Sequence, residues 1–461
     1  MGQKKASLLL SPRVQRSLVL IGIGILVVVL SFPIYAGASL WYTETKGPFK
    51  NWTQVVDLEG DGDLDVIISH TRWEGVDISW AGIGRWINQG NGKFELVRVA
   101  GTGDFAGFAA GAGDVDQDGD PDIFVQNFRI QLLENQGGLQ GGELGKFMPR
   151  GGINSPPAYS KGYRDMGGTI ATGDFNGDGR IDAFVAGCCY GVNLTRPGND
   201  YPHAPSMSWV WINDARPKSL QTGHVLPMDA LDGRPIRQVA LGDVDGDGDL
   251  DVFAAVGEPT MGMVDSLDDL LLLNDGTGRL AALDQHLGDT DSTSVALGDV
   301  NGDGRLDALV GTSAGAMLWI NQSNALGSGG PSFVPAEQSF EALQTIGDKL
   351  GAWFSAAADE RIGLYLPYGS IRTKAVFLVD LDGDENLDVL IARVWEAEIW
   401  WNDGQGQFRR SDVRVEYKED TGVAVGDFDG DGDQDIFAGR NEQDYQLWWS
   451  NGKGSFIADN R

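Results

Sequence analysis

The chain contains seven copies of a nine-residue acidic motif whose residue types are those that bind calcium. The motif reads Asp-x-(Asp/Asn/Glu)-x-Asp-Gly-x-x-Asp, and DVDGDGDLD at 243–251 is a full example. Calcium takes oxygen ligands, and alternate residues of a tight loop direct their oxygens at one centre. Zinc would want His or Cys, and magnesium rarely uses an all-protein cage, so the motif predicts calcium. We number the copies loops 1 to 7: residues 57–65, 114–122, 174–182, 243–251, 299–307, 380–388 and 427–435.

The spacing gives each loop position a separate task. Positions 1, 3, 5 and 9 would supply side-chain oxygens, position 7 a backbone carbonyl, and glycine at position 6 allows the sharp turn. Up to seven Ca2+ ions are expected, and their 14 positive charges would reduce the formal charge of −31 to about −17. The predicted metal-binding residues are Asp57, Glu59, Asp61, Asp63, Asp65, Asp114, Asp116, Asp118, Asp120, Asp122, Asp174, Asn176, Asp178, Arg180, Asp182, Asp243, Asp245, Asp247, Asp249, Asp251, Asp299, Asn301, Asp303, Arg305, Asp307, Asp380, Asp382, Asp384, Asn386, Asp388, Asp427, Asp429, Asp431, Asp433 and Asp435.

Three kinds of difference among the seven copies predict unequal sites. Loop 6 has Glu385 where glycine is expected, and a β-carbon in a left-handed conformation costs about 1–2 kcal/mol. Loop 6 is therefore expected to be the weakest or most distorted site. Loops 3 and 5 carry Asn176 and Asn301 at position 3, which lowers their ligand charge, and loop 1 has the longer Glu59 there.

The residues around each loop predict strands rather than the helices of an EF-hand. An EF-hand needs Glu at position 12 and a following helix, whereas position 12 of loop 4 is Ala254. Each loop is followed by a short apolar run, such as DVFAA at 251–255, which is typical of a buried strand. Sequences such as WWNDGQGQF at 400–408 then indicate a hairpin. With one more strand before each loop, as in GVAVGDF at 422–428, every repeat has about four strands.

Seven four-stranded units predict an all-β fold, namely a seven-bladed β-propeller with a calcium loop in each blade. The stretch GDFDGDGDQDIFAG at 426–439 follows the FG-GAP/VCBS repeat consensus, and the chain resembles that family over roughly residues 52–458. Members include the propeller of integrin α subunits and some fungal lectins. The resemblance implies calcium in the loops and a propeller that binds proteins or glycans. The fold alone does not determine the ligand.

The composition excludes some classes of partner. The 461 residues include 66 acidic and 35 basic ones, which argues against nucleic acid, whose binders carry basic patches. The only cysteines, Cys188 and Cys189, are adjacent and rarely pair in that arrangement, so no disulfide framework is expected. The apolar fraction of 42% is sufficient for a large core.

The N-terminus has the layout of a targeting segment. Basic residues precede an uncharged stretch, 17–42, whose centre is LVLIGIGILVVVL at 18–30. Residues 1–38 are predicted to be a signal peptide or a membrane anchor, 39–51 a linker, and 52–461 the propeller. In either case the propeller is expected to be exported: secreted, periplasmic or on the outer face of a membrane, anchored through 17–42 if uncleaved.

A ligand is expected on the face opposite the calcium loops, because variable connections over a rigid scaffold tend to carry binding. The longest connections there are 149–168, 186–208, 257–268 and 334–372. The strand ends expected on that face are rich in arginine and include aromatic residues, which suits an anionic sugar, a carboxylate or an acidic peptide. The alternative interpretation is that they are solvated strand ends without a ligand. The predicted ligand-binding residues are His70, Arg72, Trp73, Asn127, Arg129, Arg393, Trp395, Arg440 and Asn441.

These features favour a binding or adhesion module for a protein or glycan, not an enzyme. GTSAG at 311–315 fits the G-x-S-x-G expression, but a strand rather than a helix follows it. The alternatives are an accessory structural subunit of a membrane or envelope complex and a polysaccharide lyase. Tyr190, Tyr201 and His203 could supply acid–base groups to a lyase, but they form no recognisable constellation in the sequence.

Overall fold

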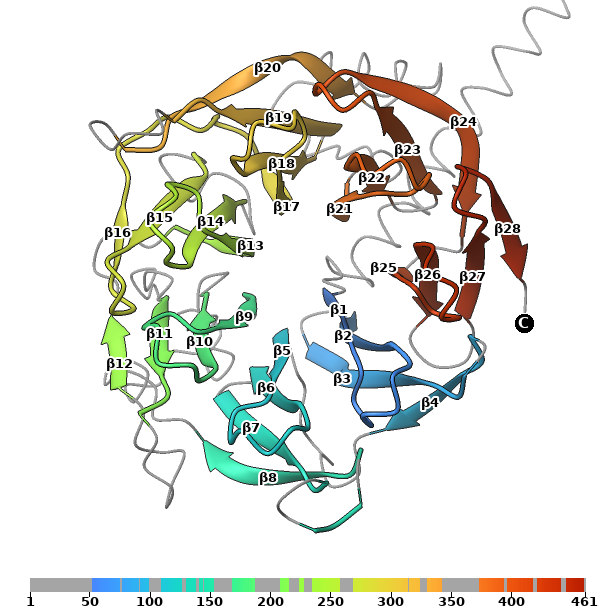
Figure 1. The fold of residues 1–461 in the computed structure, drawn as a ribbon. Helices are drawn as coiled ribbons and strands as arrows, with labels where there is room; N and C mark the ends of the chain where they lie inside the picture. The colour runs from blue at the N-terminus through green and yellow to red at the C-terminus, as the bar shows by residue number, and fades with distance from the viewer. Residues whose placement is uncertain are drawn as a thin grey trace, which may run out of the picture. The chain divides into compact units, whose positions relative to one another are not determined.

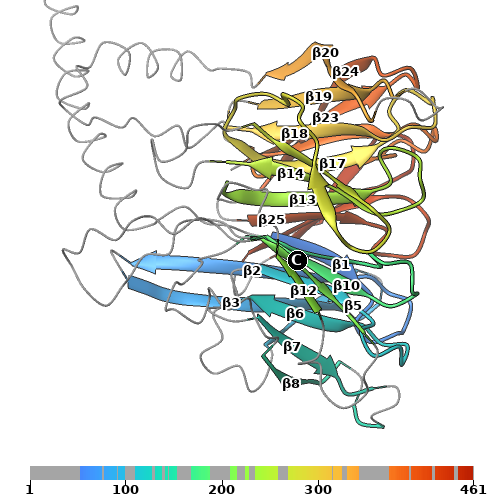
Figure 2. The same cartoon turned by 90° about the vertical axis from the view of Figure 1, so that its left-hand side faces the viewer.

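Twenty-eight strands form seven antiparallel sheets, and the four strands of each sheet are consecutive in the chain. In the computed structural model the sheets stand in a ring, with the first strand of each nearest the centre and the fourth at the rim (Figure 1). Seen from the side, the strands run across the thickness of the ring (Figure 2). The structure therefore confirms the predicted all-β, seven-bladed propeller.

The blades follow one another in chain order. Blades 1 and 2 contain β1 (Trp52–Val56), β2 (Asp65–Glu74), β3 (Asp77–Asn88), β4 (Phe94–Arg98), β5 (Ala109–Gly113), β6 (Asp122–Gln126), β7 (Ile130–Asn135) and β8 (Phe147–Gly152). Blades 3 and 4 contain β9 (Ile170–Gly173), β10 (Asp182–Val185), β11 (Trp209–Ile212), β12 (His224–Pro227), β13 (Ile236–Gly242), β14 (Asp251–Val256), β15 (Leu270–Asn274) and β16 (Leu280–Ala282). Blades 5 to 7 contain β17 (Ser292–Gly298), β18 (Asp307–Thr312), β19 (Gly315–Asn321), β20 (Phe333–Glu341), β21 (Ala375–Val379), β22 (Asp388–Ala392), β23 (Glu396–Asn402), β24 (Phe408–Glu416), β25 (Thr421–Gly426), β26 (Asp435–Arg440), β27 (Tyr445–Ser450) and β28 (Phe456–Asp459).

The structure describes most of the propeller and little outside it. A second compact unit, Met1–Pro48, Trp73–Asp77 and Gln344–Tyr368, lies almost wholly outside the described residues, as does the predicted signal or anchor segment. Within the described part of the chain, no helix is long and apolar enough to cross a bilayer. The described residues are 52–74, 77–90, 92–98, 109–126, 130–137, 141–143, 145–152, 168–186, 208–214, 224–227, 234–257, 268–313, 315–323, 330–341, 373–393, 396–417, 421–440 and 445–459.

The acidic loops connect the first two strands of every blade. In blade 4 the residue before the loop pairs with position 9, as Gly242 with Asp251, and this register recurs in all seven blades. The second strand that follows is buried along its whole length in blade 4, as the apolar run predicted. The acidic loop of blade 4 therefore sits at one end of a strand that is buried throughout.

The hydrophobic core is divided among the seven seams between neighbouring blades. Each seam has one cluster of buried residues drawn from both blades, and the seam between blades 7 and 1 includes Phe94, Phe428 and Phe437. Trp209 and Trp211 are almost fully buried in the seam between blades 2 and 3. These two tryptophans therefore serve the packing between blades.

The glycine that precedes several loops leaves room for a leucine of the next blade's loop. A Cβ at Gly242 would lie 2.5 Å from Leu306 Cδ1, and one at Gly298 would lie 2.6 Å from Leu387 Cδ1. Both leucines occupy position 8 of the next blade's loop. Real Cβ atoms essentially never approach a neighbour so closely, so glycine lets the loop of one blade rest on the strand of the previous one.

Candidate metal centres

Every loop is folded around the carboxylate at its first position. In loop 4, Asp243 Oδ1 accepts hydrogen bonds from Gly246 N at 2.7 Å and Asp247 N at 3.1 Å. Asp243 Oδ2 accepts one from Gly248 N at 3.0 Å. In all seven loops the N–H groups of positions 5 and 6 donate to position 1. Each loop is therefore held in a tight turn around this carboxylate.

A second glycine in the loop was missed in the sequence. The backbone is in the left-handed conformation at position 4 as well as at position 6, with φ of 80° at Gly246 and 95° at Gly248. Loop 2 has Gln117 at position 4, with φ of 61°. The repeated Gly at position 4 in the other six copies was the signal available in the sequence.

The aspartate at position 9 connects the loop to the rest of the blade. Asp251 is fully buried, and its Oδ2 accepts a hydrogen bond from Val244 N while its Oδ1 accepts one from Asn274 N, both at 2.9 Å. Burial raises the pKa of Asp251 to about 6, against these two hydrogen bonds, which lower it. Position 9 is thus a structural residue of the blade as well as a candidate ligand.

The pKa values of the position-9 aspartates predict an unusual pH dependence for the metal-free protein. Burial raises the pKa to about 7 for Asp65, Asp388 and Asp435, and to about 8 for Asp122. Because these values lie above the unfolded value, near 3.9, the folded state binds more protons. Without calcium, these aspartates should make their whole contribution to the free energy of unfolding below about pH 4. That contribution should be lost as the pH rises to about 8.

The measurement is the melting temperature between pH 5 and 8, in EDTA and in excess calcium. Calcium binds the deprotonated carboxylates. The fall of the melting temperature with rising pH should therefore weaken or reverse when calcium is present. Identical slopes in both buffers would contradict this account.

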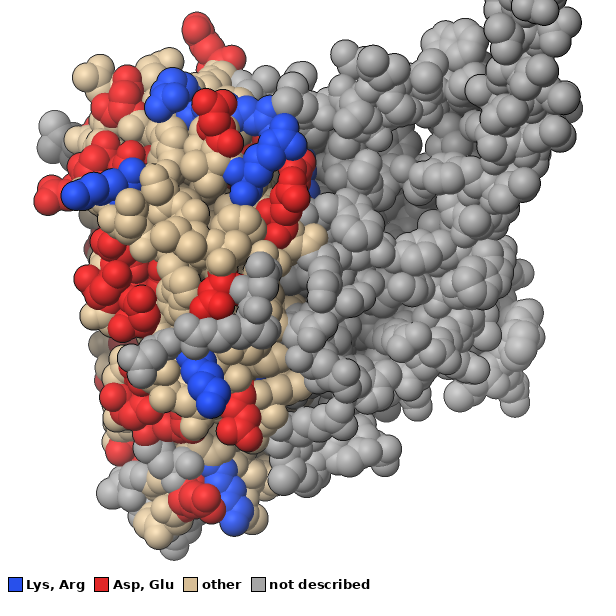
Figure 3. All heavy atoms as spheres, turned by 90° about the vertical axis from the view of Figure 1, so that its right-hand side faces the viewer, with Lys and Arg blue, Asp and Glu red and all other residues tan. Residues whose placement is uncertain are grey.

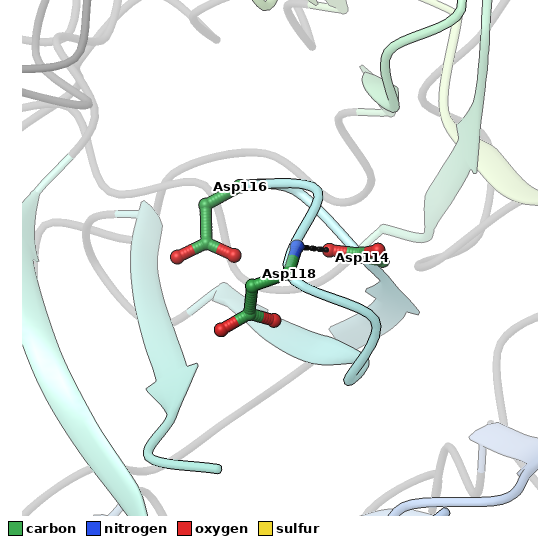
Figure 4. Close-up of side chains that lie close together, drawn as sticks. All are labelled: Asp114, Asp116 and Asp118. Carbon is green, nitrogen blue, oxygen red and sulfur yellow. Dashed lines mark hydrogen bonds between the residues drawn. The ribbon is translucent and has the colours of Figure 1, made fainter. Parts of the chain in front are cut away.

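In four loops the carboxylates converge closely enough to hold one metal ion. One oxygen from each of Asp114, Asp116 and Asp118 lies within 4.8 Å of the others, and Figure 4 shows the three side chains grouped on their loop. Loops 4, 6 and 7 gather positions 1, 3 and 9 in the same way: Asp243, Asp245 and Asp251; Asp380, Asp382 and Asp388; Asp427, Asp429 and Asp435.

Buried oxygens in these loops have no hydrogen-bond donor among the described residues. No donor reaches Asp382 Oδ1 or either carboxylate oxygen of Asp120 among these residues. Asp120 is only 3% exposed. Burial and the nearby Asp118 raise the pKa of Asp120 to about 7. A cation would satisfy such oxygens, and the all-oxygen donor set is the one that calcium prefers.

Acidic residues (red) also gather along one edge of the described surface in Figure 3.

Sequence comparison assigns the repeats to a known family. The FG-GAP-like repeat matches residues 57–125, 174–254, 243–310 and 380–438, and the FG-GAP repeat matches 292–329. The chain belongs to the FG-GAP repeat family. No curated protein sequence matches the FG-GAP propeller significantly.

Several solved structures are similar to the FG-GAP propeller at low identity. An Agrocybe aegerita lectin that recognises non-reducing terminal N-acetylglucosamine is 17% identical, with a TM-score of 0.37 over 89% of this chain and 80% of its own. The V. cholerae biofilm matrix protein Bap1 is 14% identical, with a TM-score of 0.38 over 91% of this chain and 81% of its own. The Dos1 propeller is 9% identical, with a TM-score of 0.43 over 81% and 72% of the two chains.

Loop 6 of the FG-GAP propeller keeps its shape despite Glu385. Glu385 adopts the left-handed conformation with φ of 69°, and its N–H still donates to Asp380 Oδ2 at 2.9 Å. The carboxylates of loop 6 also converge. The distortion expected for this loop is therefore not found, because the hydrogen bond from its N–H to the Asp380 carboxylate holds Glu385 in a conformation that glycine would adopt more easily. Weaker binding at loop 6 stays a prediction.

Loop 1 differs from the four convergent loops. Its longer Glu59 has a raised pKa, first because of burial and then because of Asp61, while Arg85 acts in the opposite direction. Arg85 itself lies in the seam with blade 2, where it donates to Gly145 O and stacks on Phe147. The described residues of loops 1, 3 and 5 form no group like those of the other four loops.

An asparagine at the end of the third strand links neighbouring blades beneath the loops. Asn274 N donates to Asp251, and Asn274 Nδ2 donates to Phe175 O, position 2 of the previous blade's loop, at 2.8 Å. The same pair of bonds recurs in blades 1 to 6, and across the closure of the ring Asn88 Nδ2 donates to Phe428 O at 2.9 Å. Blade 7 has Ser450 instead, which donates from its backbone to Asp435 but has no side-chain amide.

Replacing Asn88 with Ala is expected to reduce the free energy of unfolding by about 1–3 kcal/mol, since buried carbonyls of blades 7 and 1 would lose their donor. The reverse change, Ser450→Asn, is expected to add the missing link to Leu381 O and about 0.5–1.5 kcal/mol. Urea denaturation would measure both, with Gln89→Ala, an exposed neighbour, as the control. Equal stability of N88A and Q89A would show that this link does not hold the ring closed.

The predicted ligand face is only partly within the described residues. His70, Arg72 and Trp73 lie in β2 and Arg440 ends β26, but their side chains are not described. Arg393 is buried, 2% exposed, and its Nε donates to Glu398 Oε1 at 3.0 Å. Asn127, Arg129, Trp395 and Asn441 lie outside the described residues, as do Tyr190, Tyr201, His203 and both cysteines. The ligand-binding role of these residues stays a prediction.

Proposed function

We propose that the protein is an exported, calcium-stabilised FG-GAP propeller that acts as a binding or adhesion module for a protein or glycan. The observation that carries the calcium part is the convergence of three carboxylates in each of loops 2, 4, 6 and 7. Groups of like charge so close together repel each other unless a cation lies among them. The first-position carboxylate and its donors fix the loop before any ion binds, so little reorganisation would be needed.

The residues present fit calcium. In loop 4, Asp243, Asp245 and Asp251 would hold the ion with their side chains, Asp247 would add a further oxygen, and Asp249 its backbone carbonyl. No His or Cys occurs in any of the seven loops, so zinc lacks its preferred ligands. Bound calcium would neutralise carboxylates that otherwise repel each other at the turn between the first two strands.

The binding part of the proposal rests on how the connections are distributed. The loop face carries seven similar nine-residue loops, which fix the scaffold, while the longest connections leave the opposite ends of the strands. An anionic sugar, a carboxylate or an acidic peptide is the expected ligand class. Export follows from the basic and apolar N-terminal residues, which are also the basis of the alternative role as a subunit of an envelope complex.

A glycan array and a pull-down, each in calcium and in EDTA, test the binding role. We expect calcium-dependent capture that is lost in the variant His70→Ala/Arg440→Ala and retained in Glu95→Ala, an exposed change on β4. Capture that is unaffected by the first variant would mean that the ligand binds elsewhere. If no ligand is captured but the native protein co-purifies with a membrane protein through detergent, the structural-subunit role holds instead. Growth of ultraviolet absorbance on a uronate polymer would reveal a lyase.

A further inference from the structure

Two of the seven loops differ from the others in charge. Loops 3 and 5 are the only copies with Asn at position 3 and Arg at position 7, and each has three acidic residues and one arginine. Each of the other five loops has five acidic residues and no basic one. The formal charge is therefore −2 in loops 3 and 5 and −5 in the rest.

Both arginines fold back onto their own loop and blade. Arg305 Nε donates to Asn321 O at 2.8 Å, and its Nη2 pairs with Asp303 Oδ2. Arg180 makes the same two contacts, with Asn213 O at 3.0 Å and with Asp178 Oδ2 at 2.7 Å. Each guanidinium thus joins position 5 of the loop to the end of the third strand. The two cases are independent, since they lie in different blades and agree in every partner.

The carboxylate that the arginine engages is one that a metal would need. In all seven loops, Oδ1 of the position-5 aspartate accepts a hydrogen bond from the N–H of position 7. In loops 3 and 5 the guanidinium engages Oδ2 of the same carboxylate. In loop 3, Asp178 Oδ2 accepts from the Arg180 guanidinium and also from Asn176 Nδ2 at 3.1 Å. Within the described residues, no ion pair reaches loop 4.

We propose that Arg180 and Arg305 serve as fixed cations in loops 3 and 5, so that these loops close without calcium. The proposal rests on the function proposed above, because it divides the same set of loops into metal-dependent and metal-independent members. A guanidinium that is covalently part of the loop neutralises one carboxylate without depending on the calcium concentration. Metal would then be confined to the loops of charge −5, and blades 3 and 5 would keep their loops ordered when calcium is scarce.

Native mass spectrometry of the full chain, titrated with calcium, counts the ions directly. The wild type should bind no more than five, since two of the seven loops are excluded. The variants Arg180→Asp and Arg305→Asp restore the residue that loop 4 has at position 7, Asp249. Each variant should gain one ion. Arg409→Asp, the same change of charge at an exposed site on β24, should gain none.

Hydrogen exchange with and without EDTA provides a measurement on the unaltered protein. Residues 243–251 and 427–435 should lose protection when calcium is removed, while 174–182 and 299–307 should show no change. Loss of protection in all seven loops, or seven ions in the wild type, would overturn the role of the arginines and leave the calcium proposal intact. Absence of any effect of EDTA on residues 243–251 would overturn the calcium proposal itself, and the division of loops with it.

Discussion

Transfer of the protein into excess EDTA is expected to lower its melting temperature by about 10 °C or more. Loops 2, 4, 6 and 7 each bring three carboxylate oxygens within 4.8 Å of one another at the turn that starts a buried strand. An ion present at 100 times its dissociation constant stabilises the folded state by about 2.7 kcal/mol per site. With four such sites, bound calcium would contribute strongly to stability even at partial occupancy.

Readdition of calcium should restore the melting temperature, and magnesium should restore it poorly, since Mg2+ keeps its waters and rarely uses such loops. The variant Asp245→Asn removes one ligand from loop 4 and should lose part of the calcium effect. The matched variant Asp284→Asn changes the same charge at an exposed site outside the loops and should behave as wild type. An unchanged melting temperature in EDTA would mean that the loops are not coupled to folding.

Replacing Glu398 with Ala is expected to reduce the free energy of unfolding by about 3–5 kcal/mol, because it removes the carboxylate that neutralises the buried guanidinium of Arg393. Glu398 is 6% exposed and accepts from Arg393 Nε, while Arg410 Nη2 lies 3.2 Å from the same carboxylate oxygen. Tyr417 closes this site by donating from its hydroxyl to Arg393 O at 2.8 Å. The pair lies at the end of β22, away from the acidic loop of blade 6.

Urea denaturation of E398A and of Glu416→Gln, an exposed glutamate on β24, would measure this cost. The double variant Arg393→Met/Glu398→Leu should recover most of the loss, since an apolar pair of similar volume replaces the ions. If E398A is as stable as E416Q, then the buried Arg393 guanidinium does not depend on Glu398 for the stability of the fold.

The fold was predictable because its signals repeat. Seven acidic loops, each followed by an apolar run such as 251–255, recur along the chain, so an error in one repeat is corrected by the others. The loop positions were predictable for the same reason. The hairpin signature at 400–408 was also visible, and Asn402, which makes the same pair of bonds as Asn274, was part of it.

The contacts between blades were not predictable from the repeats. The bond from Asn88 to Phe428 joins residues 340 positions apart, and no local pattern indicates which carbonyl the amide reaches. The burial of Arg393 was missed because the sequence locates the end of the strand but not the residues that pack on it. The pairing of Arg305 with Asp303 was missed because position 7 was considered only for its backbone carbonyl.

The most direct test of the calcium-stabilised propeller is the metal content of the purified protein. Inductively coupled plasma mass spectrometry, after gel filtration into calcium-free buffer, would give ions per chain. We expect at least four calcium ions per chain, from the four loops whose carboxylates converge, and no stoichiometric zinc. Less than one calcium ion per chain, together with a melting temperature that EDTA does not change, would contradict the account.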